Sequence, residues 1–271
     1  MGTRAEPRRM PRPNGEATAA LARLYDLDLA DEPGDVDLYL ALADRVRGRV
    51  LELAVGSGRV AVPLAAAGHH VTGVDNDPSM LDRARSRGAA SLAGSGGSLK
   101  LIDADIVGLA LPGGARFEFA YLALNSLMTL GTRAAQQAAI QALADHLEPG
   151  GIAAVDVWLP DAEDLARYDG RLILEWARTE PTTGALVTKT GSAQHDAATG
   201  TVALTSVFEE GPQGAPPARW VRTDRLRLVS AEELTGFAET AGLRVETLAG
   251  GYDLDPFGPG SDRAVLVAIR A

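Results

Sequence analysis

The chain contains no cysteine among its 271 residues. This absence excludes disulfide bonds, thiolate metal sites and a catalytic thiol, and it rules out a secreted disulfide scaffold. The sequence also lacks any apolar run of the roughly 20 residues that a membrane-spanning helix needs. Its N-terminal stretch "MGTRAEPRRMPRPNGE" is basic and rich in proline but has no apolar core of a signal peptide. We therefore expect a cytoplasmic protein without a membrane partner.

Positive charge is scarce, with 26 Lys and Arg against 36 Asp and Glu and a net charge of −10. This balance disfavours broad contact with DNA, RNA or anionic lipid, so no nucleic-acid partner is expected. The hydrophobic share of 46% and the charged share of 23% are those of an ordinary globular protein. We predict that residues 1–15 form a disordered tail ahead of one large domain that carries an insertion.

Apolar runs alternate with helical patterns through the first half of the chain and again at its end. A short helix over 17–24 and an amphipathic helix over 36–43 come first. The expected strands are 50–54, 70–75, 98–106, 117–124 and 151–159, and the expected helices between them are 60–67, 78–87 and 133–147. "LRVETLAG" and "RAVLVAIR" add two strands near the C-terminus. The pattern predicts an α/β fold with a doubly wound, Rossmann-like, mostly parallel seven-stranded sheet.

Residues 170–229 break this alternation. Four strand-like segments follow one another there, separated by the turn-rich links "PTTG", "AATG" and "GPQGAPP". Strands joined by short links pair antiparallel. We therefore predict a small antiparallel β lid inserted into an α/β domain made of residues 16–169 and 230–271.

The stretch "VLELAVGSGRVAVPLAAAGHHVTGVDNDPSML" has the layout of a nucleotide-binding βαβ unit. Gly56 and Gly58 follow a buried strand and open a helix, where backbone N–H groups can approach a ligand closely. Asp75 ends the second strand, where a carboxylate can accept both hydroxyls of a ribose. A dinucleotide site is one alternative, because Ala61 is acceptable at its third glycine position. Glu52 argues against it, since a buried acid would repel a pyrophosphate but suits a cationic amino acid moiety.

These motifs resemble those of the class I S-adenosylmethionine-dependent methyltransferases over residues 25–160 and 230–271. "LELAVGSGR" is similar to the family's first motif, with Ala54 at the usual first glycine. "GVDNDPSML" and "DADI" are similar to the second and third, and "LALNSL" and "HLEPGGIAAVDVW" match later segments. The resemblance implies S-adenosylmethionine as cofactor, with Asn76 beside the adenine, Asp105 facing its amino group and Ile106 facing its ring. The full set of expected cofactor contacts is Glu52, Ala54, Gly56, Ser57, Gly58, Arg59, Asp75, Asn76, Met80, Ala104, Asp105, Ile106 and Leu124.

Five residues are candidates for the acceptor side. Asn125 follows the fourth strand, at the carboxyl edge where ligands bind in open α/β sheets, although it could simply hold a turn. Tyr25 and Tyr39 could close over the methyl group, with core packing as the alternative for Tyr39. Trp158 could wall the acceptor pocket or pack the lid on the core, and His195 could face the pocket or lie in a solvated turn.

Other polar residues give weaker signals. No histidine–carboxylate cluster has metal-ligand spacing, so no metal site is predicted. His146 is expected at a helix C-terminus, where a positive charge suits the helix dipole. The acidic run "YDLDLADEPGDVD" could attract a cationic acceptor or could be a solvated face.

The predicted function is methyl transfer from S-adenosylmethionine to a small-molecule acceptor. Nitrogen is preferred to oxygen as the acceptor atom, because no histidine lies at the carboxyl edge of strands four or five and Asn125 cannot take a proton. Three alternatives remain open: cofactor-dependent cyclisation on the same fold, a nicotinamide-dependent oxidoreductase, and a non-catalytic cofactor-binding partner subunit. A homodimer is compatible with the sequence.

Overall fold

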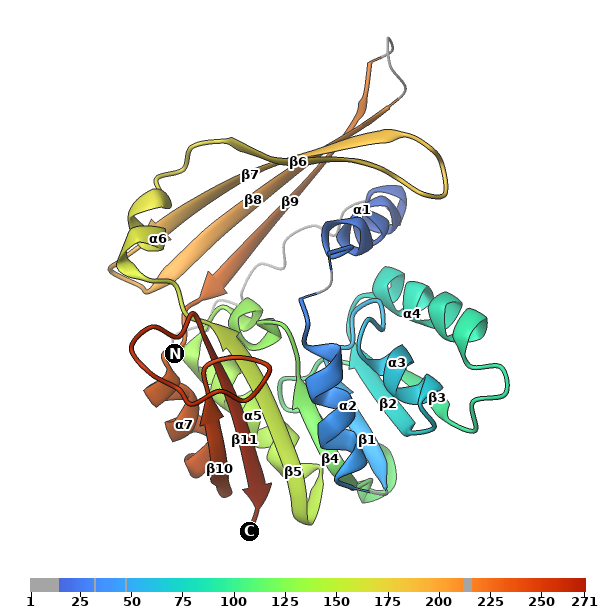
Figure 1. Ribbon diagram of the computed structural model, residues 1–271, viewed down its shortest axis with the longest axis vertical. Helices are drawn as coiled ribbons and strands as arrows, with labels where there is room; N and C mark the ends of the chain where they lie inside the picture. Colours follow the sequence, from blue (N-terminus) through green and yellow to red (C-terminus); the bar gives the residue numbers. More distant parts are fainter. Residues whose placement is uncertain (1–14, 32, 47, 212–215) are drawn as a thin grey trace, which may run out of the picture.

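The computed structural model describes residues 15–31, 33–46, 48–211 and 216–271. The predicted tail thus lies outside the described residues except for Gly15, which opens the first helix. The main sheet has seven strands in the order β10-β11-β5-β4-β1-β2-β3 (Figure 1). Their bounds are β1 Arg49–Leu53, β2 His70–Asp75, β3 Ser98–Asp103, β4 Phe117–Leu122, β5 Leu147–Trp158, β10 Leu243–Ala249 and β11 Arg263–Arg270. β1 to β5 pair in parallel, and β11 runs antiparallel to both of its neighbours. The predicted seven-stranded, mostly parallel sheet is confirmed.

Helices cover both faces of the main sheet, because both faces of its central strands are apolar. On one face lie α2 (Val36–Asp44), α3 (Ala61–Ala66) and α4 (Pro78–Ser91), whose apolar residues join a core with the strand residues Val50 and Phe119. On the other lie α5 (Arg133–Asp145) and α7 (Ala231–Thr240), packed against Leu51 and Leu53 among others. Alternate residues of a strand point to opposite faces, so β1 alone supplies both cores.

The direction of winding reverses between β1 and β4. From β1 the chain builds outward through β2 and β3, whereas β4 and β5 extend the sheet on the other side. The carboxyl ends of β1, β2, β4 and β5 therefore meet along one edge of the sheet, and the crevice between β1 and β4 is a topological switch point. Ligands bind at this position in open α/β sheets.

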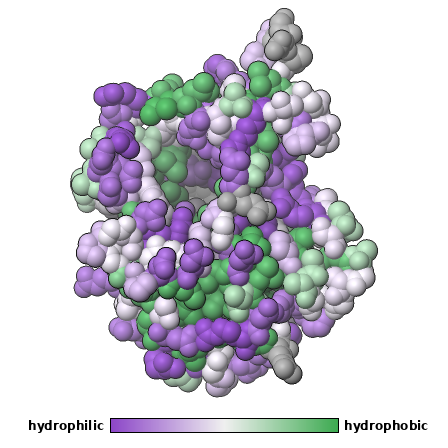
Figure 2. All heavy atoms as spheres, in the orientation of Figure 1, coloured by the Kyte–Doolittle hydropathy of each residue, from purple (hydrophilic) through white to green (hydrophobic). Residues whose placement is uncertain are grey.

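The predicted insertion forms a separate four-stranded antiparallel sheet, which we call the lid sheet. Its order is β6-β7-β8-β9, with β6 at Ile173–Thr179, β7 at Leu186–Asp196, β8 at Thr201–Gly211 and β9 at Ala218–Arg227. A short helix, α6 (Ala162–Arg167), leads into it from β5. The lid sheet stands over the carboxyl edge of the main sheet (Figure 1), and Figure 2 shows this face of the molecule hollowed between the two.

Several element boundaries differ from the sequence prediction. The first helix, α1, spans Gly15–Asp28 rather than 17–24. β3 ends at Asp103 and β4 at Leu122, several residues earlier than expected, and the single-turn elements η1 (Pro112–Gly114) and η2 (Ser126–Leu130) were not predicted. Among the helices within the described residues, none combines the length and the apolar character needed to cross a membrane.

Candidate active site

The loop between β1 and α3 depends on three residues with positive φ: Ala54 at 58°, Gly56 at 53° and Gly58 at 76°. A side chain at Gly56 would meet nothing within 4 Å, whereas one at Gly58 would come within 3.1 Å of Ala84 on α4. Gly58 therefore allows the loop to pack closely on α4, and Gly56 presents bare backbone to open space. Ala54 carries the left-handed strain that glycine avoids, about 1–2 kcal/mol.

Asp75 fixes this loop from the end of β2. One of its carboxylate oxygens accepts a hydrogen bond from the Gly56 backbone N–H at 2.8 Å, and the other accepts one from Asp77 N–H at 2.9 Å. Burial raises the pKa of Asp75 above its usual range, and these backbone donors oppose the rise. Each oxygen keeps a second lone pair. Asp75 can therefore still accept hydrogen bonds from two ribose hydroxyls, and this contact stays a prediction.

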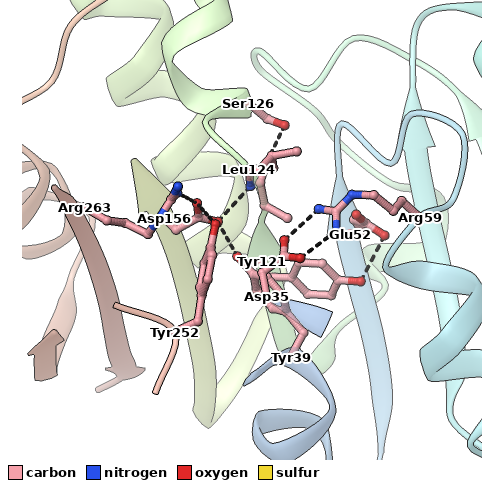
Figure 3. Close-up of polar contacts among 11 residues, drawn as sticks. Asp35, Tyr39, Glu52, Arg59, Tyr121, Leu124, Ser126, Asp156, Tyr252 and Arg263 are labelled. Carbon is pink, nitrogen blue, oxygen red and sulfur yellow. Dashed lines mark hydrogen bonds and ion pairs between the residues drawn. The ribbon is translucent and has the colours of Figure 1, made fainter. Parts of the chain in front are cut away.

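Glu52 belongs to a buried polar cluster on the β1 side of the crevice (Figure 3). Its carboxylate accepts a hydrogen bond from the Tyr121 hydroxyl at 2.9 Å, and only 3% of the residue is exposed. Arg59 lies beside it and makes a two-pronged ion pair with Asp35 at 2.6 Å for each prong. Burial raises the pKa of Glu52 to about 8, although the Tyr121 hydroxyl and the Arg59 charge oppose the shift.

The raised pKa of Glu52 predicts a stability that falls with rising pH. Between an ordinary carboxyl pKa of 4.5 and about 8, the folded state holds a proton on Glu52 that the unfolded state has released. Stability from this group is therefore complete below pH 4.5 and is lost as pH rises towards 8, with a slope of up to about 1.4 kcal/mol per pH unit. Urea unfolding of the wild type and of Glu52→Gln across pH 5–8 gives the difference in their free energies of unfolding at each pH. The other titratable groups contribute equally to both proteins, so the pH dependence of this difference belongs to Glu52. A constant difference over this range would contradict the shift.

The predicted adenine contacts follow β2 and β3. Met80 lies in the first turn of α4, which Asp77 caps by accepting from the N–H groups of Ser79 and Met80. The Ala104 N–H donates to the Asp75 carbonyl at 3.0 Å, which places the "DADI" segment beside the end of β2. The side chains of this group differ in exposure: Asn76 and Asp105 are exposed, Met80 and Ala104 half-buried, and Ile106 buried in the core. Their contacts with a cofactor stay predictions.

The segment after β4 is strained. Leu124 and Asn125 both have positive φ, 49° and 62°, in consecutive positions. The Asn125 side-chain oxygen accepts a hydrogen bond from the Trp158 backbone N–H at 2.5 Å, and the Leu124 N–H donates to Asp156 at 2.7 Å. The end of β5 thus holds both strained residues in place. Asn125 does hold a turn, and its amide nitrogen has no hydrogen-bond partner among the described residues. Both of its proposed roles therefore remain compatible with the geometry.

Asp156 is the centre of a second buried cluster (Figure 3). With 1% exposure it accepts hydrogen bonds from the Tyr39 hydroxyl at 2.6 Å, the Leu124 N–H and the Tyr252 hydroxyl at 3.0 Å, and it pairs with Arg263 at 2.8 Å. Tyr39 is fully buried in this cluster, and its ring lies 4.6 Å from that of Tyr121. Its role here is core packing, the alternative that the sequence left open. Contact between Tyr39 and a methyl group is untested.

The remaining acceptor candidates lie on three different elements. Tyr25 projects from α1 and meets Arg222 of β9, whose guanidinium lies 5.7 Å from the ring centre. The Trp158 ring packs at 6.0 Å from Tyr168 beyond α6, so it contacts the insertion. His195 lies in β7 rather than in a turn, and it shares a face of the lid sheet with Val187 and Lys189. The ring of His195 makes no hydrogen bond or ion pair within the described residues.

Four acids of the run ahead of β1 are paired with basic side chains, whereas Asp37 is exposed. Asp35 is fully buried against Arg59, and Asp26, Asp28 and Asp31 pair with basic side chains of α4 and the lid sheet. His146 is also not an exposed cation. It is 4% exposed, its Nδ1 lies 2.6 Å from the Ala142 carbonyl, and its Nε2 accepts from the Leu111 N–H, which defines a neutral ring. Both features serve internal structure.

Several residues of these clusters escaped the sequence prediction. Asp156 gives a readable signal, because it is an acid inside the apolar strand "GIAAVDVW", just as Glu52 is inside "VLELAV". Asp35, Tyr121, Tyr252 and Arg263 give none, since their partners are 24 to 107 residues away in sequence. Over the described residues, no group of three or more His, Asp or Glu side chains is placed to hold a metal ion.

Comparisons with known proteins agree with this geometry. Residues 50–151 match the family model described as a methyltransferase domain. An uncharacterized protein of Mycobacterium tuberculosis (strain H37Rv) is 54% identical over 43 residues, and this match spans only 16% of the length of each chain. The CcbJ methyltransferase from Streptomyces caelestis is 25% identical, with 96% of this chain and 97% of that chain covered and a TM-score of 0.68. The sugar N-methyltransferase KedS8 from Streptoalloteichus sp. is 19% identical, with 99% of each chain covered and a TM-score of 0.69.

The matched residues contain the glycine loop, Asp75 and the strained turn after β4, and the solved structures cover the main sheet and the lid sheet alike. Residues 50–151 are therefore a methyltransferase domain, and the chain as a whole has the fold of solved S-adenosylmethionine-dependent methyltransferases.

Proposed function

We propose that the protein transfers the methyl group of S-adenosylmethionine to the amine of a small molecule held under the lid sheet. The observation that carries the proposal is the arrangement around Gly56. Its backbone faces open space, its N–H is held by Asp75 at 2.8 Å, and the interacting pair Glu52 and Arg59 flanks it in the chain, before and after the glycine loop. A cofactor with a ribose at one end and a zwitterionic amino acid at the other matches this order of groups.

The residues fit that cofactor by their chemistry. Asp75 has lone pairs left for two ribose hydroxyls, Arg59 offers a positive charge to a carboxylate, and a bound ammonium group would draw the proton off Glu52 and pair with its carboxylate. A pyrophosphate would bring no cation to favour the charged form of Glu52 and would keep this buried acid protonated, which disfavours a nicotinamide cofactor. When bound, S-adenosylmethionine supplies a methyl carbon already activated by a positive sulfur. The protein's part is to align the acceptor and exclude water, which can contribute several kcal/mol.

The acceptor would lie between the strained turn after β4 and the lid sheet. Asn125 keeps a free amide N–H for orienting it, and Trp158 supplies an apolar wall beside Tyr168. A hydroxyl acceptor requires a general base, whereas a neutral amine does not. Asp156 already accepts four polar contacts and has no lone pair left for a proton. Because acids of the run ahead of β1 are already paired with basic side chains, attraction of a cationic acceptor no longer supports an amine. The preference for a nitrogen acceptor therefore rests on the lack of a base.

Binding and turnover together test the proposal. Calorimetry should detect S-adenosylhomocysteine and should not detect NAD. Incubation of the enzyme and S-adenosylmethionine with a metabolite extract, followed by mass spectrometry, should give a product heavier by one methyl group. Tight NAD binding would favour an oxidoreductase, a product of unchanged carbon count would favour cyclisation, and binding without any turnover would favour a partner subunit.

His195→Ala tests the preference for an amine acceptor. Because an amine needs no strong base, we expect the methylation rate to stay within about tenfold of the wild type, whereas loss of a general base lowers rates roughly 10²–10⁴-fold. The measurement is the steady-state rate with the acceptor identified above, alongside calorimetric affinity for S-adenosylhomocysteine. A fall in the larger range with cofactor affinity intact would make His195 the base and favour an oxygen acceptor.

A further inference from the structure

Helix α1 lies between the lid sheet and α4 (Figure 1). Its apolar residues Leu24 and Leu27 are buried against Val187 and Phe208 of the lid sheet. Asp28, at its C-terminal end, accepts from the Trp176 indole at 2.8 Å and from the Lys189 ammonium at 2.6 Å. One side of α1 is thus fixed to the lid sheet, and the other side faces the glycine loop.

Asp26 makes the contacts on that other side. Its Oδ1 accepts from the Ser57 hydroxyl at 2.5 Å and pairs with Arg87 at 2.9 Å, and its Oδ2 accepts from Arg83 Nε at 2.6 Å. Ser57 belongs to the glycine loop, whereas Arg83 and Arg87 belong to α4, the helix that follows Asp75. A single carboxylate on α1 therefore ties the glycine loop to α4.

The position of Ser57 makes this contact consequential. Ser57 is 1% exposed and lies between Gly56 and Gly58, whose backbones are the most freely rotating in the loop. The hydroxyl is its only polar side-chain group, and within the described chain the carboxylate of Asp26 is its hydrogen-bond acceptor. Holding Ser57 therefore fixes the direction of the backbone N–H groups on either side of it.

We propose that Asp26 is a positioning residue for cofactor binding. It acts through Ser57, whose hydroxyl it holds so that the Gly56–Gly58 backbone is arranged before the cofactor arrives. This inference rests on the proposed function, because the ligand it concerns is S-adenosylmethionine or its product S-adenosylhomocysteine. It assigns a role in binding to a residue outside the glycine motif, on a helix that precedes it in the chain.

A double-mutant cycle in S-adenosylhomocysteine affinity tests this role. Asp26→Asn and Ser57→Ala should each weaken binding by about tenfold, since a hydrogen bond to a charged group is lost in both. The double variant should also be about tenfold weaker rather than a hundredfold, because the two residues act as one unit. Asp28→Asn is the matched control: it removes a carboxylate from the same helix that contacts only the lid sheet, and its affinity should stay within twofold of the wild type.

A merely structural role would give a different pattern. If Asp26 only ties helices together, Ser57→Ala alone would leave the affinity unchanged, and this result would overturn the proposal even if Asp26→Asn failed to fold. Multiplicative losses in the double variant would also overturn it, because they would mean that Ser57 contacts the ligand independently of Asp26. Absence of binding by the wild type would instead refute the proposed function.

Discussion

Asp75→Ala is expected to weaken S-adenosylhomocysteine binding by about 2–4 kcal/mol. Hydrogen bonds to a charged group contribute roughly 1.5–3 kcal/mol each, and two bonds to one ribose do not add fully. The structure adds a second reason for a large effect, because Asp75 also accepts the Gly56 N–H and so shapes the loop that borders the site. Titration calorimetry at neutral pH measures the loss, which corresponds to about 30- to 1000-fold in Kd.

Asp75→Asn is the matched control for this prediction. The amide keeps nearly the same volume and one acceptor oxygen for the Gly56 N–H, while it loses the charge, the acceptor for the Asp77 N–H and one ribose acceptor. Its affinity should lie between those of the wild type and Asp75→Ala. Equal affinity in all three proteins would show that Asp75 contributes to binding neither through the ribose nor through the loop, and the ribose would then need another partner.

The sequence was sufficient for the fold because the signal lies in local patterning. Apolar runs such as Val50–Leu53 and Phe119–Leu122 are buried on both faces, which makes them continuous rather than alternating, and the helices between them are amphipathic. Strand ends were placed less well. The expected strands ran on to include Asp105 and Leu124, but pairing with the neighbouring strands stops at Asp103 and Leu122. Hydrogen-bond pairing, rather than composition, decides where a strand ends.

The candidate site was predictable only where its residues are close in sequence. Gly56, Gly58 and Asp75 share one βαβ unit, and in the structure Asp75 accepts a hydrogen bond from the Gly56 N–H. The acidic run shows the limit of such reasoning. Asp35 looks like its solvated neighbours until folding places Arg59, 24 residues later, against it. Charge pairing over such distances depends on the tertiary arrangement, which composition does not encode.

Asp156 is the clearest case of a residue whose importance is tertiary. It lies in the middle of an apolar strand, and yet four donors from four other segments converge on it. Two of these donors, the Tyr39 hydroxyl of α2 and the Leu124 N–H after β4, come from elements far apart in the sequence. The Asp156 carboxylate therefore fixes the strained turn that contains Asn125 to the buried end of β5.

Asp156→Ala is accordingly expected to lower the free energy of unfolding by about 3–5 kcal/mol. Removing one partner of a buried ion pair leaves the other charge uncompensated, here Arg263, and the Tyr39 hydroxyl and Leu124 N–H would lose their acceptor as well. For a domain of this size the loss corresponds to a fall in melting temperature of about 6–15 °C. Urea unfolding followed by circular dichroism at constant pH gives the free energy, provided that the m-value is unchanged.

Asp82→Ala supplies the comparison, because Asp82 forms an exposed ion pair with Arg85 on the surface of α4. Exposed pairs contribute roughly 0–1 kcal/mol, so this variant should unfold close to the wild type. Asp156→Asn should fall between the two, since an amide oxygen still accepts from Leu124 but no longer neutralises Arg263. Losses of similar size at Asp82 and Asp156 would mean that water replaces the missing carboxylate, and Asp156 would then have no special part in holding the acceptor edge of the sheet.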